Sequence, residues 1–344
     1  MESAVQARVQ PFSQGRETWS QLVNAVSGAT LYHSEPWIEL LGRAYKFPLS
    51  LFSIERGGQT VAGCVLARSH NPFARRFISL PFSDCAPPLA LDEAAADNLL
   101  NSLVARPTPG VSYEIRGIAR RSPWQTVECF VQWNLALDRP LKTIERGLAL
   151  NFRRNLRHAQ REPITIERGS GIEHLHRFYS LQLESRRRLG LPPQPWSFFR
   201  MAREIFAPRD DLDVWLASER GEDVASAVFL RSGDEVSFKW GARRPARLSK
   251  ANHLLLWSAI EHFASSCRIL DLGRADIRNQ GLSRFKRELG ATPDPLPYSF
   301  YPRRPAQISS EVLSGPGKVL ASIWTRMPIV ATRIAASAMY RFLA

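Results

Sequence analysis

The residues best suited to chemistry lie in one stretch, residues 267–301. Residues 268–272 form a short apolar run that ends before a glycine, which predicts a buried strand. A polar loop follows over 274–279, and residues 281–289 have the spacing of a short helix that Gly290 ends. Ligands collect at strand ends in open α/β sheets. We therefore expect four polar side chains to meet at the end of this strand: Asp271, Arg274, Asn279 and Lys286.

Lys286 can supply the positive charge that stabilises an oxyanion. Only six of the 46 basic residues are lysines, so a lysine in this stretch is not a routine surface choice. When a carbonyl carbon is attacked, negative charge develops on its oxygen, and a fixed donor there contributes typically ~3 kcal/mol. Asp271 is the second catalytic candidate, and its alternative role is to pair with Arg274. Asp276 lies in the loop, and no general base is assigned.

Other catalytic and metal-binding patterns are weak or missing in the sequence. It has no GxSxG, HExxH or P-loop motif. Its four cysteines are widely spaced and include no CxxC pair, which disfavours a metal site and a disulfide framework. The seven histidines are scattered, and the neighbours His174 and His176 have no obvious third ligand. We therefore predict no metal and no tightly bound cofactor.

Length and charge limit the class of protein. At 344 residues the chain is long enough for two domains with real cores. Hydrophobic content of 44% and charged content of 23% are typical of a folded soluble protein. A net charge of +14, nearly all from arginine, favours anionic partners: a phosphate-bearing substrate, tRNA or an acidic membrane surface. For most individual arginines, the alternative is an ordinary surface cation.

Two hairpin-like segments indicate an internal duplication. Residues 53–68 read SIERGGQTVAGCVLAR, and residues 217–231 read ASERGEDVASAVFLR. The ERG triplets are 164 residues apart and the Val-Ala pairs 163, so we expect the second turn to be one residue shorter. Strand, loop, helix and strand follow each hairpin in the same order. This period suits a duplicated domain, and we predict that the hairpins hold equivalent places in two similar lobes.

A basic helix is predicted between the two halves, over residues 151–161 (NFRRNLRHAQR). Arg153, Arg157 and Arg161 are spaced by four residues and therefore line one face. The run contains no acidic residue, so its arginines repel one another unless an anion lies nearby. We favour anion binding by Arg153 and Arg157 over the alternative of a solvated helix face.

The stretch that holds Lys286 also carries a family resemblance. DLGR at 271–274, followed by N-x-G-L-x-x-F-K-R-x-x-G-A at 279–291, resembles the C-terminal signature of Fem-type (FemABX-like) acyltransferases of the GNAT superfamily, often labelled BioF2-like acetyltransferases. A weaker likeness extends over roughly residues 31–301. The resemblance implies an α/β (α+β) fold of two tandem GNAT-like lobes, each a mixed, mostly antiparallel sheet flanked by helices. We place the lobes at 1–150 and 151–305, with a basic amphipathic tail at 306–344.

The resemblance also implies a reaction. Known Fem-type members add amino acids to peptidoglycan precursors from aminoacyl-tRNA, and many relatives belong to exopolysaccharide or protein-sorting systems. The implied chemistry is amide formation, in which a primary amine attacks an activated ester or thioester carbonyl. Phe285 is the neighbour of Lys286 in the family motif, and packing against the core is its alternative role. Asp84 lies in a Pro-rich loop where the family places acceptor-binding residues, although aspartate before prolines is also a common turn former.

The loop before the helix predicted at 253–265 bears on the acyl donor. An ordinary GNAT enzyme binds the coenzyme A pyrophosphate there through backbone N–H groups of a glycine-rich turn. Here residues 247–252 read RLSKAN without a glycine, so we expect a poor backbone cradle and disfavour an acyl-CoA donor. A mobile basic turn is the alternative interpretation. The substrate-binding candidates around this loop are Trp240, Arg247 and Asn252.

The two ends of the chain bear on where the protein is located. The N-terminus lacks a signal-peptide pattern and no run reaches the length of a membrane span, so we expect the protein in the cytoplasm. From residue 315 the tail has no acidic residue, and it either lies in the interface at the inner face of the plasma membrane or docks on the second lobe. The rivals to a Fem-like N-acyltransferase are an acyl-CoA-dependent GNAT enzyme and a catalytically inactive basic module that binds RNA or membrane.

Overall fold

The chain divides into two compact units of α/β structure. The computed structural model describes residues 5–70, 75–105, 109–118, 122–244, 250–302 and 325. The first unit takes in the described residues of Met1–Phe130 and Pro295–Ile308, and the second those of Val131–Asp294. Both units contain a mixed sheet and helices, so the predicted fold class is confirmed. The tail predicted at 306–344 lies outside the described residues, apart from Thr325.

The first unit begins with a strand and two helices, which four consecutive strands, a third helix and a further strand follow. In chain order these are β1 (Val5–Pro11), α1 (Phe12–Ala25), the 3-10 turn Leu31–His33, α2 (Glu35–Tyr45), β2 (Leu49–Arg56), β3 (Gln59–Arg68), β4 (Arg75–Ile78), β5 (Leu89–Ala90), α3 (Glu93–Val104) and β6 (Val111–Arg116). With β13 (Thr292–Tyr301), the sheet has the order β1-β2-β3-β4-β6-β13, and β5 pairs with β3. β4 and β6 are parallel, whereas the pairs β1–β2, β2–β3, β3–β4, β3–β5 and β6–β13 are antiparallel.

Two helices of this unit begin at residues whose side chains cap them. Ser34 Oγ accepts a hydrogen bond from Trp37 N at the start of α2, and Pro36 occupies its first turn. Asp92 Oδ1 accepts from Ala95 N at 2.7 Å and begins α3 in the same way. These caps satisfy backbone N–H groups that the helices themselves leave without a partner.

His33 is a buried histidine in the first unit, with only 2% of its surface exposed. Its Nδ1 accepts from Thr30 N at 2.9 Å, so the ring proton lies on Nε2, which donates to Pro87 O at 2.9 Å. Burial is the main cause that lowers the pKa of His33 to about 4, against the raising effect of the Pro87 bond. The imidazole is therefore neutral at neutral pH.

We expect His33 to make the protein less stable in mild acid. Its folded pKa of about 4 lies below the unfolded value of 6.5, so the stability is complete above pH 6.5 and is lost as the pH falls toward 4. One such group contributes about 2 kcal/mol of this loss between pH 7 and pH 5. Denaturant unfolding at both pH values should show a smaller loss in His33→Asn, whose Oδ1 can still accept from Thr30. An equal loss in both proteins would contradict the prediction.

The second unit is built from β7 to α9. Its elements are β7 (Gln125–Ala136), α4 (Leu141–Gly147), α5 (Leu150–Ala159), β8 (Ile164–Gly169), α6 (Ile172–Arg188), α7 (Trp196–Phe206), the 3-10 turn Ala207–Arg209, β9 (Leu212–Glu219), β10 (Glu222–Ser232), β11 (Glu235–Arg243), α8 (Ala251–Phe263), β12 (Ile269–Asp276) and α9 (Gln280–Glu288). The sheet has the strand order β7-β12-β11-β10-β9-β8.

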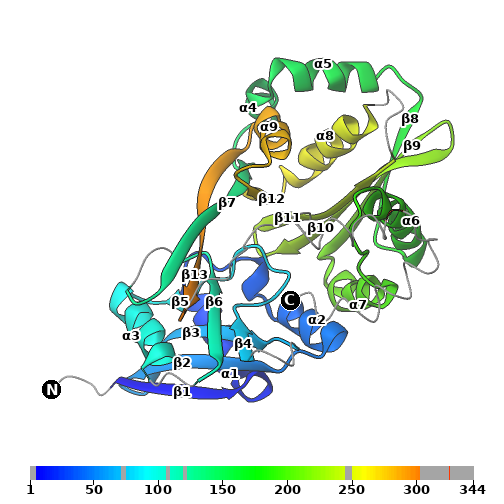
Figure 1. Cartoon of the computed structure of the whole chain (residues 1–344). Coiled ribbons are helices and arrows are strands. Elements are labelled where there is room, and N and C mark those ends of the chain that lie inside the picture. The colour runs from blue at the N-terminus through cyan, green and yellow to red at the C-terminus, as the bar shows by residue number, and fades with distance from the viewer. Residues whose placement is uncertain are drawn as a thin grey trace. The chain divides into compact units, whose positions relative to one another are not determined.

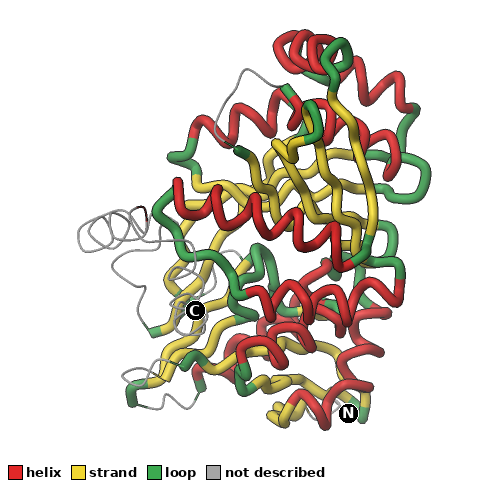
Figure 2. The backbone as a smooth tube through the Cα atoms, turned by 90° about the vertical axis from the view of Figure 1, so that its right-hand side faces the viewer, coloured by secondary structure: helices red, strands yellow, loops and turns green. Residues whose placement is uncertain are grey.

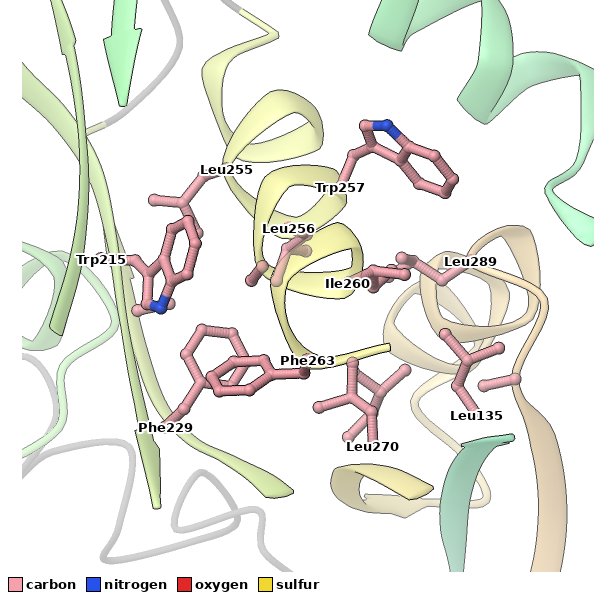
Figure 3. Close-up of a cluster of buried hydrophobic side chains, with 14 of the residues drawn as sticks. Leu135, Trp215, Phe229, Leu255, Leu256, Trp257, Ile260, Phe263, Leu270 and Leu289 are labelled. Atoms are coloured by element: carbon pink, nitrogen blue, oxygen red, sulfur yellow. The ribbon is translucent and has the colours of Figure 1, made fainter. Parts of the chain in front are cut away.

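Helices cover both faces of this second sheet. α5, α8 and α9 lie on one face, and α6 and α7 on the other (Figures 1 and 2). α8 is enclosed on both sides, because Trp215 and Phe229 of the sheet contact one side of it and Leu289 lies on the other (Figure 3). A helix that is apolar nearly all round is expected in such a buried place. α8 thus forms the centre of the core that supports α5 and α9.

Each sheet is completed by a strand from the other half of the sequence. β13 pairs with β6 in the first unit, from Tyr298 opposite Arg116 to Tyr301 opposite Tyr113. β7 adds its residues from Val131 onward to the second unit, beside β12. The compact units therefore divide the chain at Phe130 and Asp294. The lobe boundaries at 150 and 305 stay a prediction.

The two hairpins hold the same place in their sheets. β2–β3 lies next to the edge strand β1, and β9–β10 lies next to the edge strand β8. Both turns have two residues, Gly57–Gly58 and Arg220–Gly221, all with positive φ. The expectation of a shorter second turn was wrong. Val61 and Val224 are the extra residues of two bulges at matching places in the hairpins. Equivalent residues of the two hairpins are therefore 163 positions apart throughout. The two ERG triplets, which are 164 positions apart, do not occupy equivalent places.

Candidate active site at the end of strand β12

β11 and β12 begin as neighbours and then separate. Their parallel pairing covers only Glu235–Ser237 against Ile269–Asp271. β11 nevertheless continues to Arg243 and β12 to Asp276, so the described ladder between the two strands ends well before the strands do. A sheet that opens in this way leaves backbone N–H and C=O groups that must find other partners. We refer to this opening as the splay.

Lys286 satisfies two of these backbone groups. Its side chain is buried, with 5% exposed, and its Nζ donates to Gly273 O at 2.8 Å and to Arg274 O at 3.0 Å. Successive carbonyls of a regular strand point to opposite edges. Gly273 has φ of +76°, which other residues rarely adopt, and this local turn lets both carbonyls face one ammonium group. Lys286 is therefore a buried residue of the splay, and the surface alternative is excluded.

Asp271 is held within the sheet by several hydrogen bonds. Its carboxylate accepts from Gln132 Nε2 on β7, from Gly273 N at 2.6 Å and from Ser237 Oγ on β11 at 3.3 Å. These bonds connect three strands at the point where β11 and β12 separate. This arrangement favours a structural role for Asp271, and its role as a catalytic carboxylate stays a prediction.

The residues that follow β12 fix the start of α9. Asn279 Oδ1 accepts from Leu282 N at 3.1 Å and caps the helix. Asp276 pairs with Arg278 at 2.9 Å, and this bond is the main cause that lowers the pKa of Asp276. The predicted end of the strand at Gly273 was wrong, since β12 continues to Asp276. The strand continues because glycine accommodates the positive φ that its bend requires.

Phe285 belongs to an aromatic cluster between α5, α8 and α9. Its ring lies 6.4 Å from Phe152 and 6.0 Å from His253, which are themselves 4.7 Å apart. Asn155 Nδ2 lies 3.3 Å from His253 Nε2. Burial is the main cause that lowers the pKa of His253 to about 4, so its imidazole is neutral. Phe285 packs against the core, and a substrate contact for it stays a prediction.

From the sequence, His253 could lie near a strand end, although a lone histidine is more often structural, and its contacts with Phe152 and Phe285 were not predicted. The available signal was its place beside Asn252 in the first turn of the helix predicted at 253–265. A single histidine in an apolar segment carries too little information to be assigned to a site, because its neighbours Phe152 and Asn155 are about a hundred residues away in the chain. Their proximity is a property of the tertiary structure.

α5 carries the predicted basic face. Arg153 is partly buried, and its Nε has no hydrogen-bond partner within the described ranges, whereas Arg157 is exposed. Glu288 connects this helix to α9, because Asn151 Nδ2 donates to its side chain at 3.2 Å and Ala149 N donates to its carbonyl at 3.0 Å. Anion binding by Arg153 and Arg157 stays a prediction, and the buried Nε of Arg153 is compatible with it.

The remaining candidates of the second unit lie apart from the Lys286 contacts. Trp240 is buried and packs against Phe198 and Phe199 of α7, with ring centroids 5.6 and 5.3 Å away. This packing favours a core role for Trp240. Asn252 lies partly buried in the first turn of α8. Arg247 lies outside the described residues.

Asp84 is anchored within the first unit. Tyr32 donates its hydroxyl to Asp84 Oδ2 at 2.8 Å, and Tyr298 donates to the Asp84 carbonyl at 2.7 Å. Leu80 and Phe82 in the same loop have φ of 60° and 62°. Bulky residues rarely adopt such angles, and strain of this kind is often found at binding sites. The acceptor-binding role of Asp84 stays a prediction that this strained loop supports.

The first unit has no splay at the matching strands within the residues described. β4 pairs with β6 along its whole length, from Arg75 to Ile78, and Ser79 N extends the pairing by donating to Glu114 O. Burial opposes the charge of Glu114, but the guanidinium groups of Arg116 and Arg76 outweigh it and lower its pKa. This strand end is thus filled by an ion-paired carboxylate. We therefore place the candidate active site in the second unit.

No group of three or more His, Cys, Asp or Glu residues in the described part of the chain is placed to hold a metal ion. The groups gathered around the splay are a lysine ammonium, backbone N–H and C=O groups, the Asp271 carboxylate and nearby aromatic rings. Such a set suits charge stabilisation and hydrogen bonding.

Comparison with known proteins identifies the class. Residues 148–287 match the model of a family described as an acetyltransferase (GNAT) domain, and this range contains the splay and Lys286. A comparison with curated protein sequences finds no significant match.

Solved structures share the fold over most of the chain. The crystal structure of FemX has a TM-score of 0.62 at 12% identity and covers 83% of this chain and 95% of its own. A tandem GNAT protein from the clavulanic acid biosynthesis pathway has a TM-score of 0.54 at 12% identity, with 88% and 100% covered. L-PGS from Bacillus licheniformis has a TM-score of 0.53 at 14% identity, with 90% and 97% covered. At these identities the likeness concerns the fold.

The fold and the domain match define a GNAT-type acyltransferase. The resemblance to FemABX-like acyltransferases that the DLGR and FKR segments carry is confirmed, and the matched GNAT domain covers residues 148–287. The expectation of an enzyme that transfers acyl or aminoacyl groups is confirmed as well.

Proposed function

We propose that this acyltransferase transfers an aminoacyl group from tRNA to an amine of a cell-envelope precursor. The observation that carries the proposal is the buried Lys286, bound to two carbonyls at the splay of a GNAT domain. Peptidoglycan precursors are the acceptors that the Fem-type resemblance implies, and polysaccharide and protein amines are the alternatives. The structural likeness to FemX supports the first of these.

The proposed reaction forms an amide and breaks an ester. The acceptor nitrogen attacks the ester carbonyl carbon, the C–N bond forms, and the C–O bond breaks to release the tRNA hydroxyl. The amine gives up one proton to water or to a substrate group. Lys286 acts by its charge near the developing oxyanion and by holding Gly273 and Arg274 in place. Aromatic rings around Phe285 keep water away from one side of this region.

The donor is a co-substrate in this proposal, and no tightly bound cofactor takes part. The net charge of +14 supports an anionic donor such as tRNA. A peripheral contact of the basic tail with the inner face of the plasma membrane remains part of the proposal, as does a cytoplasmic location. No described helix combines the length and the apolar character needed to cross a membrane.

Two rival functions remain open to test. The first rival is an acyl-CoA-dependent GNAT enzyme. The similar tandem GNAT protein supports this rival, because its structure was determined without AcCoA. A catalytically inactive basic module that binds RNA or membrane is the second. The polar residues at the strand end and Lys286 favour an enzyme over this second rival.

We expect acetyl-CoA to bind weakly or not at all. Residues 247–252 contain no glycine, so we expect a poor backbone cradle for a pyrophosphate. Calorimetric titration should give a Kd weaker than about 100 µM. A Kd near 1 µM, or about −8 kcal/mol, would place the acyl-CoA enzyme first.

A transfer assay tests the proposed function directly. The full chain is incubated with aminoacyl-tRNA or acetyl-CoA, together with a nucleotide-linked muropeptide, an amino-sugar polymer or a peptide with a free amine. Mass spectrometry should detect an aminoacyl amide on the muropeptide, formed only with aminoacyl-tRNA. An acetylated product alone would support the acyl-CoA rival. No product with any pair would support the inactive module.

A further inference from the structure

An open pocket of about 720 Å³ lies on the outer face of α9, within the second unit. Its floor is mostly apolar and comes from β7, the start of α5, the segment after β12 and the start of β13. The apolar lining residues are Val131, Trp133, Ala149, Ile277 and Pro293. A pocket of this size accommodates a small molecule.

The polar wall of the pocket is formed by successive turns of α9. Gln280, Ser283, Arg284 and Arg287 recur at helical spacing and line the pocket together with Glu288. Lys286 lies on the opposite side of the same helix, where it bonds to β12. The pocket is therefore distinct from the splay.

The charged side chains in this wall differ in whether they have an ion-pair or hydrogen-bond partner. Glu288 is occupied, because Arg284 Nε donates to its Oε1 at 3.1 Å and Asn151 Nδ2 to its Oε2 at 3.2 Å. Arg287 instead lies over the Trp133 ring, 5.5 Å from its centroid. Within the described part of the chain its guanidinium has no ion pair or hydrogen bond. One exposed cation thus lies beside an apolar floor without a carboxylate partner.

Two apolar residues of the pocket lining are themselves exposed. Ile277 is 52% exposed, and Pro293 is exposed as well. Large apolar side chains grouped beside a pocket are uncommon on a soluble surface and indicate a binding site. They increase the area available to a hydrocarbon chain.

We infer that this pocket binds an amphiphilic anion, a medium-chain acyl carboxylate. The acyl chain lies against Ile277 and Pro293, and the carboxylate pairs with Arg287. Arginine recognises a carboxylate through two parallel N–H···O bonds, a geometry that a planar guanidinium stacked on an indole ring can present. A ligand with only a hydrocarbon chain would leave Arg287 unpaired, and a ligand with only a carboxylate would leave the apolar floor uncovered.

Calorimetry of the full chain with octanoate tests this inference. Octanoate is expected to bind with a Kd of about 1 mM or tighter, as suits a ligand of its size. Octanol, which has the same chain without the charge, should bind at least tenfold more weakly. Arg287→Gln should weaken octanoate by tenfold or more, and Ser283→Phe should weaken it by filling the pocket while leaving every charge in place.

Arg200→Gln is the matched control, because Arg200 is an exposed arginine on α7 outside the pocket. It should leave octanoate binding unchanged, and thermal unfolding confirms that each variant is folded. Equal binding of octanol and octanoate, or no effect of Arg287→Gln, would overturn the inference. Displacement of octanoate by millimolar inorganic phosphate would overturn it too, since the site would then recognise an anion alone. Absence of octanoate binding up to 10 mM, on the order of ten times the expected Kd, would overturn it as well.

Discussion

Replacement of Lys286 by methionine is expected to lower the rate of acyl transfer by roughly a hundredfold or more. Methionine keeps the apolar stem of the side chain but removes the charge. The change also leaves the carbonyls of Gly273 and Arg274 without the donor that they have in the native protein. We therefore expect a loss of about 1–3 kcal/mol in the free energy of unfolding. The transfer assay and denaturant unfolding measure the two effects separately.

Lys142→Met is the matched control for this prediction, because Lys142 is exposed on α4. It should change stability by less than about 0.5 kcal/mol and leave the rate unchanged. Equal and small effects of the two substitutions would show that Lys286 has neither role. A loss of stability in Lys286→Met with an unchanged rate would leave only the structural role.

The second large effect is expected for Gly273→Ala. A Cβ at φ of +76° costs about 1–2 kcal/mol of strain. Relief of this strain would rotate the peptide units whose carbonyls face Lys286, so the ammonium would lose its position. A misplacement of this kind can lower the rate by roughly ten- to a hundredfold. The transfer rate and the unfolding free energy are measured on the same preparation.

Gly221→Ala is the control that distinguishes the effect of backbone strain from an effect on the candidate active site. Gly221 has φ of +81° in the β9–β10 turn, and a Cβ there would meet no atom within 4 Å. It should therefore lose similar stability without any loss of rate. If both glycine variants retain the native rate, the geometry of Gly273 does not matter for transfer.

Much of the fold was predictable from local signals. The helix caps at Ser34 and Asp92, both hairpins and the strand–helix order around Lys286 all follow from patterns within about ten residues. Local patterns of this kind depend on backbone preferences that act before tertiary contacts form.

The candidate site was only partly predictable. The FKR segment indicated Lys286, but its two carbonyl partners depend on the bend at Gly273, which a strand pattern does not reveal. Asp271 binds Gln132, which lies 139 residues earlier in the chain. Trp240 looked equally suitable for substrate, and only its packing against α7 distinguishes it. Contacts between segments that are distant in the chain determine these roles, and such contacts cannot be predicted from a single sequence.

The exchange of β7 and β13 between the two sheets has a consequence for how the chain folds as it is synthesised. The first sheet needs residues 298–301 beside β6, so it cannot be completed until nearly the whole chain has left the ribosome. Until then the edge of β6 exposes unpaired backbone groups, which favour pairing with other chains. Contacts so distant in sequence also slow folding. Fragments cut near residue 150 would therefore each lack a strand, and mixing the two fragments should restore structure that neither has alone.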